Sequence, residues 1–548
     1  MALTYTEIEQ QKNTRILFFF AVVVLFYFVV AVVLASVAKV FFSTEIYGRG
    51  TFLLSGRQLL YVLVFALVAA VLHSAYSVHH AFAFISGNLQ ATGIDPTDAH
   101  HQRFKKVLDE VNVATGNRCT LTPVVIPTVA MNAFAISNRK REALVGITEG
   151  LLSRLTRPQL LAVVAHEVAH VVSGDSFQAT IGCALFGIYA AMLSGIGKTF
   201  RGGRIRVSGR GGAGVLLFIL LIYVLLSVLQ FFYNLIRLFV SRDRELRADA
   251  IAVKLTRDPI SLSEALYIIG RRWRGLGVLD RSLESLFIIN PIQEERDESE
   301  GLWADLLSTH PPIRKRIVLL AQMAHTDARD IEAGVLQQEK IRETFRKTGP
   351  REAEMRWMAL EQEKGWRGPL TVTQLLHLDW LRPDSWLKGV GEEAMKQAKD
   401  EPSLKPFFDG QIQAPNVSSW KCPHCQQSLV EEAYEGALVW RCVFCEGVLM
   451  DEAKTGRIVI RREKTFSERI QKLADLTQRN SLDVLREKPR RTSLFHLGCP
   501  RCGNKMVRNF YTMAYLVEVD RCYACQFIWF DKDELEIVQA MIERTQLL

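Results

Sequence analysis

Residues 156–175 read TRPQLLAVVAHEVAHVVSGD, and this stretch determines how the rest of the chain is interpreted. Thr156, followed three residues later by Gln159, has the pattern of a capping box, in which two side chains bond the free backbone groups at a helix start. Pro158 is tolerated in a first helical turn because the N–H that it lacks would have no partner there. The pattern predicts a helix between Leu151 and about residue 175.

Two histidines on that helix have the spacing of metal ligands. His166 and His170 are four residues apart, so both imidazoles lie on one face, where they can hold a single Zn²⁺ ion. Glu167 projects beside them and can take a proton from a zinc-bound water. A catalytic zinc needs a third protein ligand and an open position; Glu245 can be that ligand, with Asp249 orienting a ligand histidine. The alternative for the histidine pair is a helix whose two histidines are satisfied by hydrogen bonds. The alternative for the segment with Glu245 and Asp249 is an exposed, charged helix start.

In their order, these motifs resemble the HtpX and CAAX-prenyl-protease family of membrane zinc endopeptidases. The resemblance rests on HEVAH at 166–170 and on ELRAD at 245–249, which follows it across a hydrophobic hairpin. Three further fragments extend it over about residues 1–330: MNAFA at 131–135, ALVGIT with GLL within 143–152, and STHPP at 308–312 with Arg316.

The resemblance implies a role for each matching residue. It makes His166, His170 and Glu245 the ligands of the catalytic zinc, Glu167 the general base and Asp249 a residue behind the ligands. His310 would stabilise the oxyanion of the tetrahedral intermediate. Asn132 would hold the substrate backbone, because it lies in the segment before the edge strand that pairs with substrate in this family. Asp175 also matches a family position, without an assigned role.

Composition sets limits on the class of protein. The chain has 548 residues, 49% of them apolar, with 67 Lys and Arg against 58 Asp and Glu and a formal charge of +9. Its mean hydropathy of +0.09 is high for a soluble protein. These values exclude collagen, a disordered tail protein and a small disulfide scaffold. The basic excess alone does not distinguish nucleic acid from anionic lipid or from the basic loops of a membrane protein.

The apolar residues gather in four blocks. Residues 16–38 and 59–78 are long enough to span a bilayer, which predicts an N-terminal membrane hairpin. A cleaved signal peptide is the alternative for the first block, but its apolar run is longer than the usual signal core. Blocks 181–196 and 215–236 predict a second hairpin, in which the shorter block is either re-entrant or fully spanning.

The membrane orientation contains a conflict. If Glu245 and His166 bind one ion, the chain between them must cross the membrane twice or not at all. Two crossings put residues 198–210, with five positive charges, on the side opposite the active site, against the positive-inside rule if that site faces the cytoplasm. We still expect the active site and the C-terminal region to face the cytoplasm, on a bacterial-type inner membrane. The CxxC cysteines in the last quarter of the chain need reduced thiols, which a cytoplasmic location provides.

Eight of the ten cysteines form four CxxC pairs in the last quarter of the chain. Cys422 and Cys425 are followed by Cys442 and Cys445, and Cys499 and Cys502 by Cys522 and Cys525, with gaps of similar length inside the two modules. The modules are an internal repeat, because Met450-Asp451 in the first echoes Phe530-Asp531 in the second at the same distance after the last CxxC pair. Each set of four thiolates closes a structural Zn²⁺ site with no open position. The second module resembles the TFIIB-type zinc ribbon.

The expected fold class is an α-helical membrane protein with an α+β zinc-metallopeptidase domain, followed by two small β zinc-ribbon domains. The expected divisions are a membrane hairpin at 1–85, a peptidase domain at 86–345 interrupted by hairpin 181–236, a helical connector at 346–417, a ribbon at 418–460, a linker helix at 461–495, and a ribbon with a terminal helix at 496–548.

The expected function is zinc-dependent endopeptidase activity in membrane-protein quality control, with one catalytic and two structural Zn²⁺ ions. Its partners would be misfolded or membrane polypeptides and lipid; we expect the ribbons to bind protein rather than nucleic acid, and an oligomer is left open. The alternative from another class is a membrane-anchored zinc-ribbon adaptor with an inactive or latent peptidase fold. The physiological substrate and the cleavage preference do not follow from the sequence.

Overall fold

The computed structural model describes residues 17, 20–36, 39, 54–185, 193, 220, 223–224, 226–228, 242–271, 311–348, 356–362, 365–378, 380–392, 394–409, 417–461, 466–479 and 497–545. These fall into two compact units. The first contains Met1–Ile94 and Arg103–Glu332, and the second contains Asp95–Gln102 and Ala333–Leu548. Most of the predicted hairpin 181–236 lies outside the described residues.

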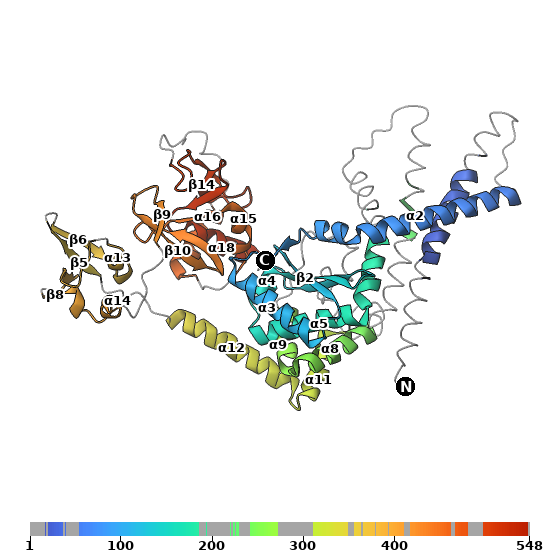
Figure 1. The fold of residues 1–548 in the computed structure, drawn as a ribbon, viewed down its shortest axis with the longest axis horizontal. Helices are drawn as coiled ribbons and strands as arrows, with labels where there is room; N and C mark the ends of the chain where they lie inside the picture. Colours follow the sequence, from blue (N-terminus) through green and yellow to red (C-terminus); the bar gives the residue numbers. More distant parts are fainter. Residues whose placement is uncertain are drawn as a thin grey trace. The chain divides into compact units, whose positions relative to one another are not determined.

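The first unit is built around a four-stranded sheet in the order β1-β2-β4-β3. Strand β2 and several helices of this unit are labelled in Figure 1. Strands β2 and β4 run parallel, and β3 pairs antiparallel with β4 at the edge of the sheet. The elements of this unit are α2 (Gly56–Asn88), β1 (Thr92–Gly93), α3 (Ala99–Ala114, whose first turn belongs to the second unit), β2 (Thr120–Ile126), β3 (Ala133–Ser137), β4 (Glu142–Thr148), α4 (Glu149–Leu152), α5 (Arg157–Ser173), α8 (Arg242–Thr256), α9 (Pro259–Arg271), α11 (Ile313–Met323) and the start of α12 (Ala328–Thr348).

Helix α5 is the centre of this unit. It packs against strands β3 and β4, which precede it in the sequence, and against helices α8 and α9, which follow it. Its apolar positions Leu160, Val163, Val164 and Val168 are all buried. Because α5 is buried on nearly every side, its polar residues lie inside the protein rather than at the surface.

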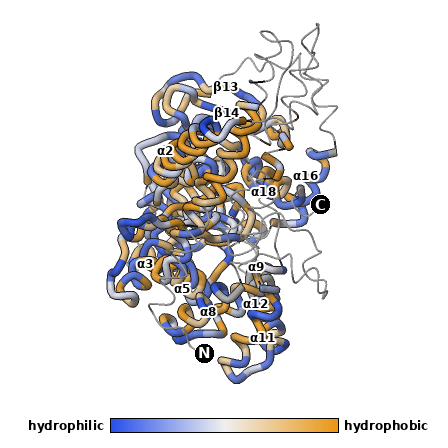
Figure 2. The backbone as a smooth tube through the Cα atoms, turned by 90° about the vertical axis from the view of Figure 1, so that its right-hand side faces the viewer, coloured by the Kyte–Doolittle hydropathy of each residue, from blue (hydrophilic) through white to orange (hydrophobic). Residues whose placement is uncertain are grey.

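Helix α2 extends beyond the predicted span of 59–78. Among the described residues it is the one helix long and apolar enough to cross a membrane, and 11% of an apolar 18-residue window in it is buried. In Figure 2 much of α2 has the orange colour of hydrophobic residues. At 1.5 Å per residue its 33 residues are about 50 Å long, against about 30 Å for a bilayer core. The excess length is used at the C-terminal end, where Ile85 and Leu89 pack with Val124, Ile126 and Phe134 of the sheet. A shorter apolar helix, Phe20–Ser36, lies within the first predicted span.

The helical connector predicted for 346–417 is wrong over most of its length. After α12, the second unit has a four-stranded sheet in the order β6-β5-β7-β8. The strands are β5 (Trp357–Glu361), β6 (Gly365–Leu370), β7 (Trp386–Gly389) and β8 (Met395–Gln397), with short helices α13 (Val372–Leu376), η3 (Ala398–Asp400) and α14 (Lys405–Phe408). Its core residues, Trp357, Leu375, Leu387 and Leu404, are far apart in sequence. Strands of three to six residues that are stabilised by such distant contacts leave little periodicity to detect.

The two cysteine modules form one continuous sheet, where separate ribbon domains were expected. The order of its seven strands is β13-β14-β15-β12-β11-β10-β9, and β12 and β15 join the modules. The elements are β9 (Val417–Lys421), β10 (Ser428–Tyr434), β11 (Ala437–Arg441), β12 (Val448–Asp451), α15 (Glu452–Ile458), α16 (Glu468–Arg479), β13 (Val507–Phe510), β14 (Glu518–Cys522), β15 (Phe527–Phe530) and α18 (Glu534–Thr545). Helix α16 lies in the predicted linker helix 461–495, of which 462–465 and 480–495 fall outside the described residues.

The second unit also includes the segment Asp95–Gln102. Arg461 Nη1 donates to Asp98 Oδ2 at 2.8 Å and to the Glu435 carbonyl oxygen at 2.7 Å, and the side chains of Asp98 and Arg461 are fully buried. The Ala99 N–H donates to the Gly436 carbonyl oxygen at 2.8 Å. A buried ion pair with such hydrogen bonds defines the position of a segment, because moving either partner leaves a buried charge without compensation.

We expect Gly150→Ala to destabilise the first unit. A Cβ atom at Gly150 would lie 2.0 Å from the Val129 carbonyl oxygen, so the loop before β3 would have to move. Overpacking of this kind typically destabilises by about 1–3 kcal/mol. The measurement is the thermal unfolding midpoint of the purified protein, with Gly87→Ala as the control, because a Cβ atom there meets nothing within 4 Å. Equal midpoints for the two variants would contradict the prediction.

Candidate functional site

Local sequence sets where the ligand-bearing helix begins and ends. Thr156 is the N-cap of α5, and the predicted capping box with Gln159 is present, with the Thr156 N–H donating to Gln159 Oε1 at 3.0 Å. The helix therefore begins at Arg157, and Leu151 belongs to the separate short helix α4. At the other end, Gly174 has a φ of 74°, a left-handed conformation that terminates α5 four residues after His170.

His166, His170 and Glu245 lie together, as the spacing predicted. One ligand atom from each lies within 4.8 Å of the others. The Nε2 atoms of the two histidines are 3.2 Å apart, and they lie 3.4 and 3.5 Å from the Glu245 carboxylate oxygens. Bonds of about 2.05 Å to a tetrahedral Zn²⁺ ion place neighbouring ligand atoms about 3.3 Å apart. The three donors therefore fit a zinc ion without rearrangement.

A buried carboxylate and a buried arginine support the first histidine. Asp249 Oδ1 lies 2.9 Å from His166 Nδ1, the ring nitrogen that faces away from the other ligands. Arg316 of α11 donates from Nε and Nη2 to the Asp249 carboxylate at 2.8 and 2.6 Å, and its Nη1 lies 3.4 Å from Glu245 Oε2. Burial alone would raise the pKa of Asp249, but the charge of Arg316 and the contact with His166 hold that pKa at about 2. Asp249 is therefore ionised and keeps the His166 ring oriented.

Asp175 has a comparable place behind the second histidine. Its Oδ2 lies 4.0 Å from His170 Nδ1 and accepts a hydrogen bond from Ser173 Oγ at 2.8 Å. Arg244 and Arg247 lie 3.6 and 3.7 Å from the Asp175 carboxylate. Both arginines belong to α8, where they stand on either side of the ligand Glu245. The sequence indicated Asp175 only through the family resemblance, without a role. Its place depends on α8 packing against the end of α5, which spacing alone does not reveal.

Glu167 is buried next to the ligands. Its exposed fraction is 3%, and this burial raises the pKa of its carboxyl group to about 7. A carboxyl group with a pKa near neutrality can both accept and return a proton. Because the side chain of His170 is 15% exposed while that of His166 is fully buried, solvent reaches the ligand cluster on the side of His170. This is the side on which an open zinc position can exchange water.

The remaining predicted site residues have different outcomes. Asn132 is 1% exposed, and its Oδ1 accepts a hydrogen bond from the Ala133 N–H, so its carboxamide helps to begin the edge strand β3. A contact between Asn132 and substrate stays a prediction. His310 lies outside the described residues, so its predicted role is not tested. Arg316, which the sequence indicated only as part of the HtpX-like segment, is the most important residue that spacing missed.

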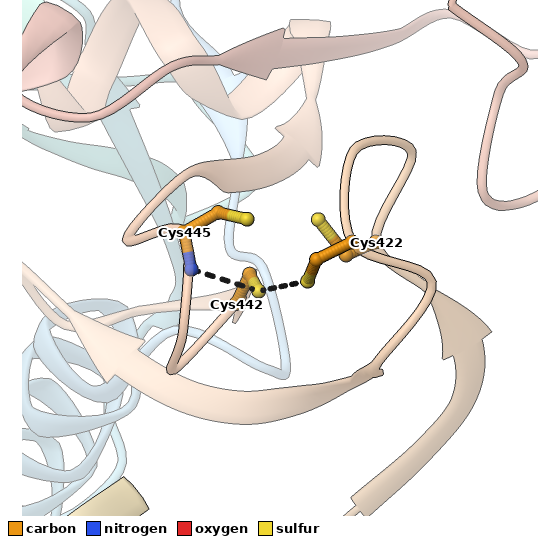
Figure 3. Close-up of side chains that lie close together, drawn as sticks. Cys422, Cys442 and Cys445 are labelled. Atoms are coloured by element: carbon orange, nitrogen blue, oxygen red, sulfur yellow. Dashed lines mark hydrogen bonds between the residues drawn. The ribbon is translucent and has the colours of Figure 1, made fainter. Parts of the chain in front are cut away.

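The eight C-terminal cysteines form two clusters, and the ligand atoms in each lie within 4.8 Å of one another. Neighbouring sulfur atoms are 3.5 Å apart in the first cluster and 3.4–3.5 Å apart in the second. Figure 3 shows Cys422, Cys442 and Cys445 converging from two turns of the chain. Zn–S bonds of about 2.3 Å require S···S distances of about 3.8 Å, so small shifts would complete each site.

All four CxxC turns have the same backbone geometry. The residue after the second cysteine has a positive φ in each, although only one of the four is glycine: Gln426, Glu446, Gly503 and Gln526. Its N–H donates to the carbonyl oxygen of the first cysteine of the turn, at 2.8–3.0 Å. A left-handed backbone is unfavourable for residues other than glycine. Non-glycine residues nevertheless adopt it at the same position in three of the four turns, which indicates that these turns are shaped to hold their ligands.

Comparison with known proteins agrees with this geometry. The model of peptidase family M48 matches residues 97–324, and a model described as a transcription factor zinc-finger matches residues 498–540. No solved structure matches the chain.

The curated relatives include several proteases. The chain is 36% identical over 202 residues to the protease HtpX homolog of Acidiphilium cryptum, covering 36% of this chain and 65% of the relative. It is 30% identical to the homolog of Dictyoglomus turgidum (42% and 72% covered) and 30% identical to that of Streptococcus equi subsp. equi (47% and 85% covered). The chain thus spans just under two thirds of the first of these relatives.

We expect Arg316→Gln to weaken binding of the catalytic zinc. Without the guanidinium group, the Asp249 carboxylate keeps only its contact with His166, and Glu245 loses its contact with Arg316. Loss of such supporting contacts typically lowers metal affinity by about 10- to 100-fold. Metal analysis after dialysis against a chelator should show one zinc lost, with the thiolate-bound zincs retained. Arg314→Gln, exposed on the same helix, is the matched control; loss of the same zinc from both variants would contradict the assignment.

One conclusion follows from three observations: the ligand cluster on α5 and α8, the capped HExxH helix, and the similarity to curated homologs over up to 85% of their length. The chain belongs to peptidase family M48, among the HtpX homologs.

Proposed function

We propose that this chain is a membrane-bound zinc endopeptidase. The observation that carries the proposal is the set of three donors at tetrahedral spacing, with a buried carboxyl group, Glu167, beside them. A zinc ion bound there supplies a Lewis acid that polarises the scissile carbonyl group and lowers the pKa of water. The side chain of His170 is 15% exposed, and we assign the water and the substrate carbonyl group to this side of the ligand cluster.

The residues of the chain divide the remaining work. Glu167 accepts the proton of the attacking water and returns it to the leaving amine. Asp249 accepts a hydrogen bond from His166 Nδ1, so that Nε2 presents its lone pair to the metal. Arg316 keeps Asp249 ionised and limits the movement of Glu245. In this proposal His310 stabilises the oxyanion and Asn132 contributes to holding the substrate backbone.

The proposed substrates are misfolded or membrane polypeptides, in a role in membrane-protein quality control. Helix α2 supports a membrane location because its apolar surface is exposed and its length exceeds a bilayer core. We propose that the active site and the ribbons face the cytoplasm, which keeps eight zinc-binding thiols reduced. The proposed partner of the ribbons is protein.

An adaptor with an inactive peptidase fold has less support. Such a protein would be expected to lack a zinc ligand or the base. His166, His170, Glu245 and Glu167 are all present, and the three ligands are close enough together to share one ion.

Cleavage of an unfolded protein tests the proposed activity. The detergent-purified protein should hydrolyse casein, and Glu167→Gln should lower the rate by about 10²- to 10⁴-fold, because the amide cannot accept the proton. Zinc content should be equal in both, since Glu167 is not a ligand. Glu110→Gln, at an exposed position in α3, serves as the control. Equal residual activity in the parent and in Glu167→Gln would indicate a contaminating protease; zinc-loaded protein without activity would favour the adaptor or a latent enzyme.

The pH dependence of the rate follows from the burial of Glu167. Burial raises the pKa of Glu167 to about 7, and the double charge of a bound zinc ion lowers it from there. The base acts as a carboxylate, so kcat/KM should fall as the pH falls through the pKa of this group, below about 7. The measurement is kcat/KM for a peptide substrate from about pH 5 to about pH 9. A rate that rises as the pH falls through this range, with zinc retained, would remove Glu167 from this role.

A further inference from the structure

The repeated cysteine modules are joined at equivalent positions. Strand β12 of the first module pairs antiparallel with β15 of the second, with Leu449 opposite Trp529, its counterpart in the repeat. Val448 lies opposite Phe530, which is the counterpart of Met450. Conversely, Met450 lies opposite Ile528, the counterpart of Val448, so the pairing is reciprocal about the central pair of Leu449 and Trp529. Reciprocal pairing of this kind is the pattern of a two-fold interface between identical surfaces. The modules are therefore arranged like the two halves of a homodimer within one chain.

The residues beside this junction form one core that contains both sets of ligands. Leu449, Phe527 and Trp529 are at most 4% exposed. Phe527 comes from the second module, but its ring centroid lies 5.7 and 5.6 Å from those of Trp420 and Trp440 of the first. The same cluster includes the most buried cysteines of both modules: Cys422, Cys442, Cys499 and Cys522.

A polar contact also connects the two modules. Asp531 follows β15 in the second module, and its Oδ1 lies 2.9 Å from Nε2 of His424, which stands between the ligands of the first module's first turn. Trp529 Nε1 donates to the same oxygen at 2.8 Å, and Arg508 Nη2 donates to Oδ2 at 3.0 Å. A displacement of the His424 turn therefore changes the surroundings of Asp531 and of the central strand β15.

From this arrangement we infer that the two tetrads bind zinc cooperatively, as one metal-binding unit. Binding of a structural zinc ion contributes directly to the folding free energy of the loops that hold it. In this sheet, the strands of one module complete the core of the other, so an ion in either tetrad orders part of the second binding site. Linkage then requires that each tetrad raises the zinc affinity of the other by the same factor. This inference concerns the ribbons alone and is independent of the proposed peptidase activity.

The test is to disable one tetrad in the full-length protein. Co²⁺ gives a thiolate charge-transfer absorption at the cysteine sites, which the site of His166, His170 and Glu245 lacks because it has no sulfur ligand. In Cys499→Ser/Cys502→Ser only the first tetrad reports, and competition with Zn²⁺ gives its affinity. We expect this affinity to fall by about 5- to 150-fold relative to the parent protein, and the converse variant, Cys422→Ser/Cys425→Ser, to lower the affinity of the second tetrad equally. An affinity within about twofold of the parent value would overturn the inference.

A second variant avoids the loss of ligands. His424→Gln/Asp531→Asn retains all eight cysteines but replaces the imidazole–carboxylate contact between the modules with two neutral amides. The parent protein should load both tetrads in one steep titration, and this variant in a shallower one. Met513→Ala, at a position that is 81% exposed in the second module, is the matched control and should titrate like the parent. Two independent loading steps in the parent protein would show that the tetrads act separately.

Discussion

The buried ion pair between Arg316 and Asp249 is the contact on which the first unit depends. Removing two charges from water is unfavourable unless their hydrogen bonds are nearly complete, and here Arg316 donates twice to Asp249 while Asp249 also faces His166. The pair joins α11 to α8 and, through His166, to α5. Three helices from distant parts of the chain are thereby held at the spacing that a single metal ion needs. Glu245, beside the same guanidinium group, is part of this arrangement.

The ligand cluster combines rigid parts with one accessible side. His166, Glu167 and Asp249 are almost fully buried, so their orientations are determined by packing, whereas His170 keeps some exposure. Chemistry at a metal requires both properties, because ligands must not rearrange and substrate must still reach the ion. The edge strand β3 begins at Ala133, directly after Asn132, and is packed against α5, which bears both histidines. Strand β3, which is the edge strand among the described residues, therefore belongs to the same packed body as the ligands.

The second unit reuses one simple element four times. Each CxxC turn has a left-handed residue after its second cysteine and the same closing backbone hydrogen bond. Two turns make a tetrad, and two modules make one sheet by pairing equivalent strands. A single module would leave β12 or β15 as an exposed, apolar edge strand, which favours association with other chains. Joining the modules covers both edges and brings the two ligand sets into one core.

Sequence alone determined the features that arise within short stretches: the capped helix α5, the histidines one turn apart, the four CxxC turns and the apolar helix α2. Local hydrogen bonding and ligand spacing act over a few residues and therefore leave a readable pattern. The place of Asp175 behind His170, the pairing of Arg316 with Asp249, the small sheet from Trp357 to Gln397 and the union of the two ribbons were decided only by the tertiary structure. These depend on contacts between residues that lie far apart along the chain, and such contacts leave no periodic trace in the sequence.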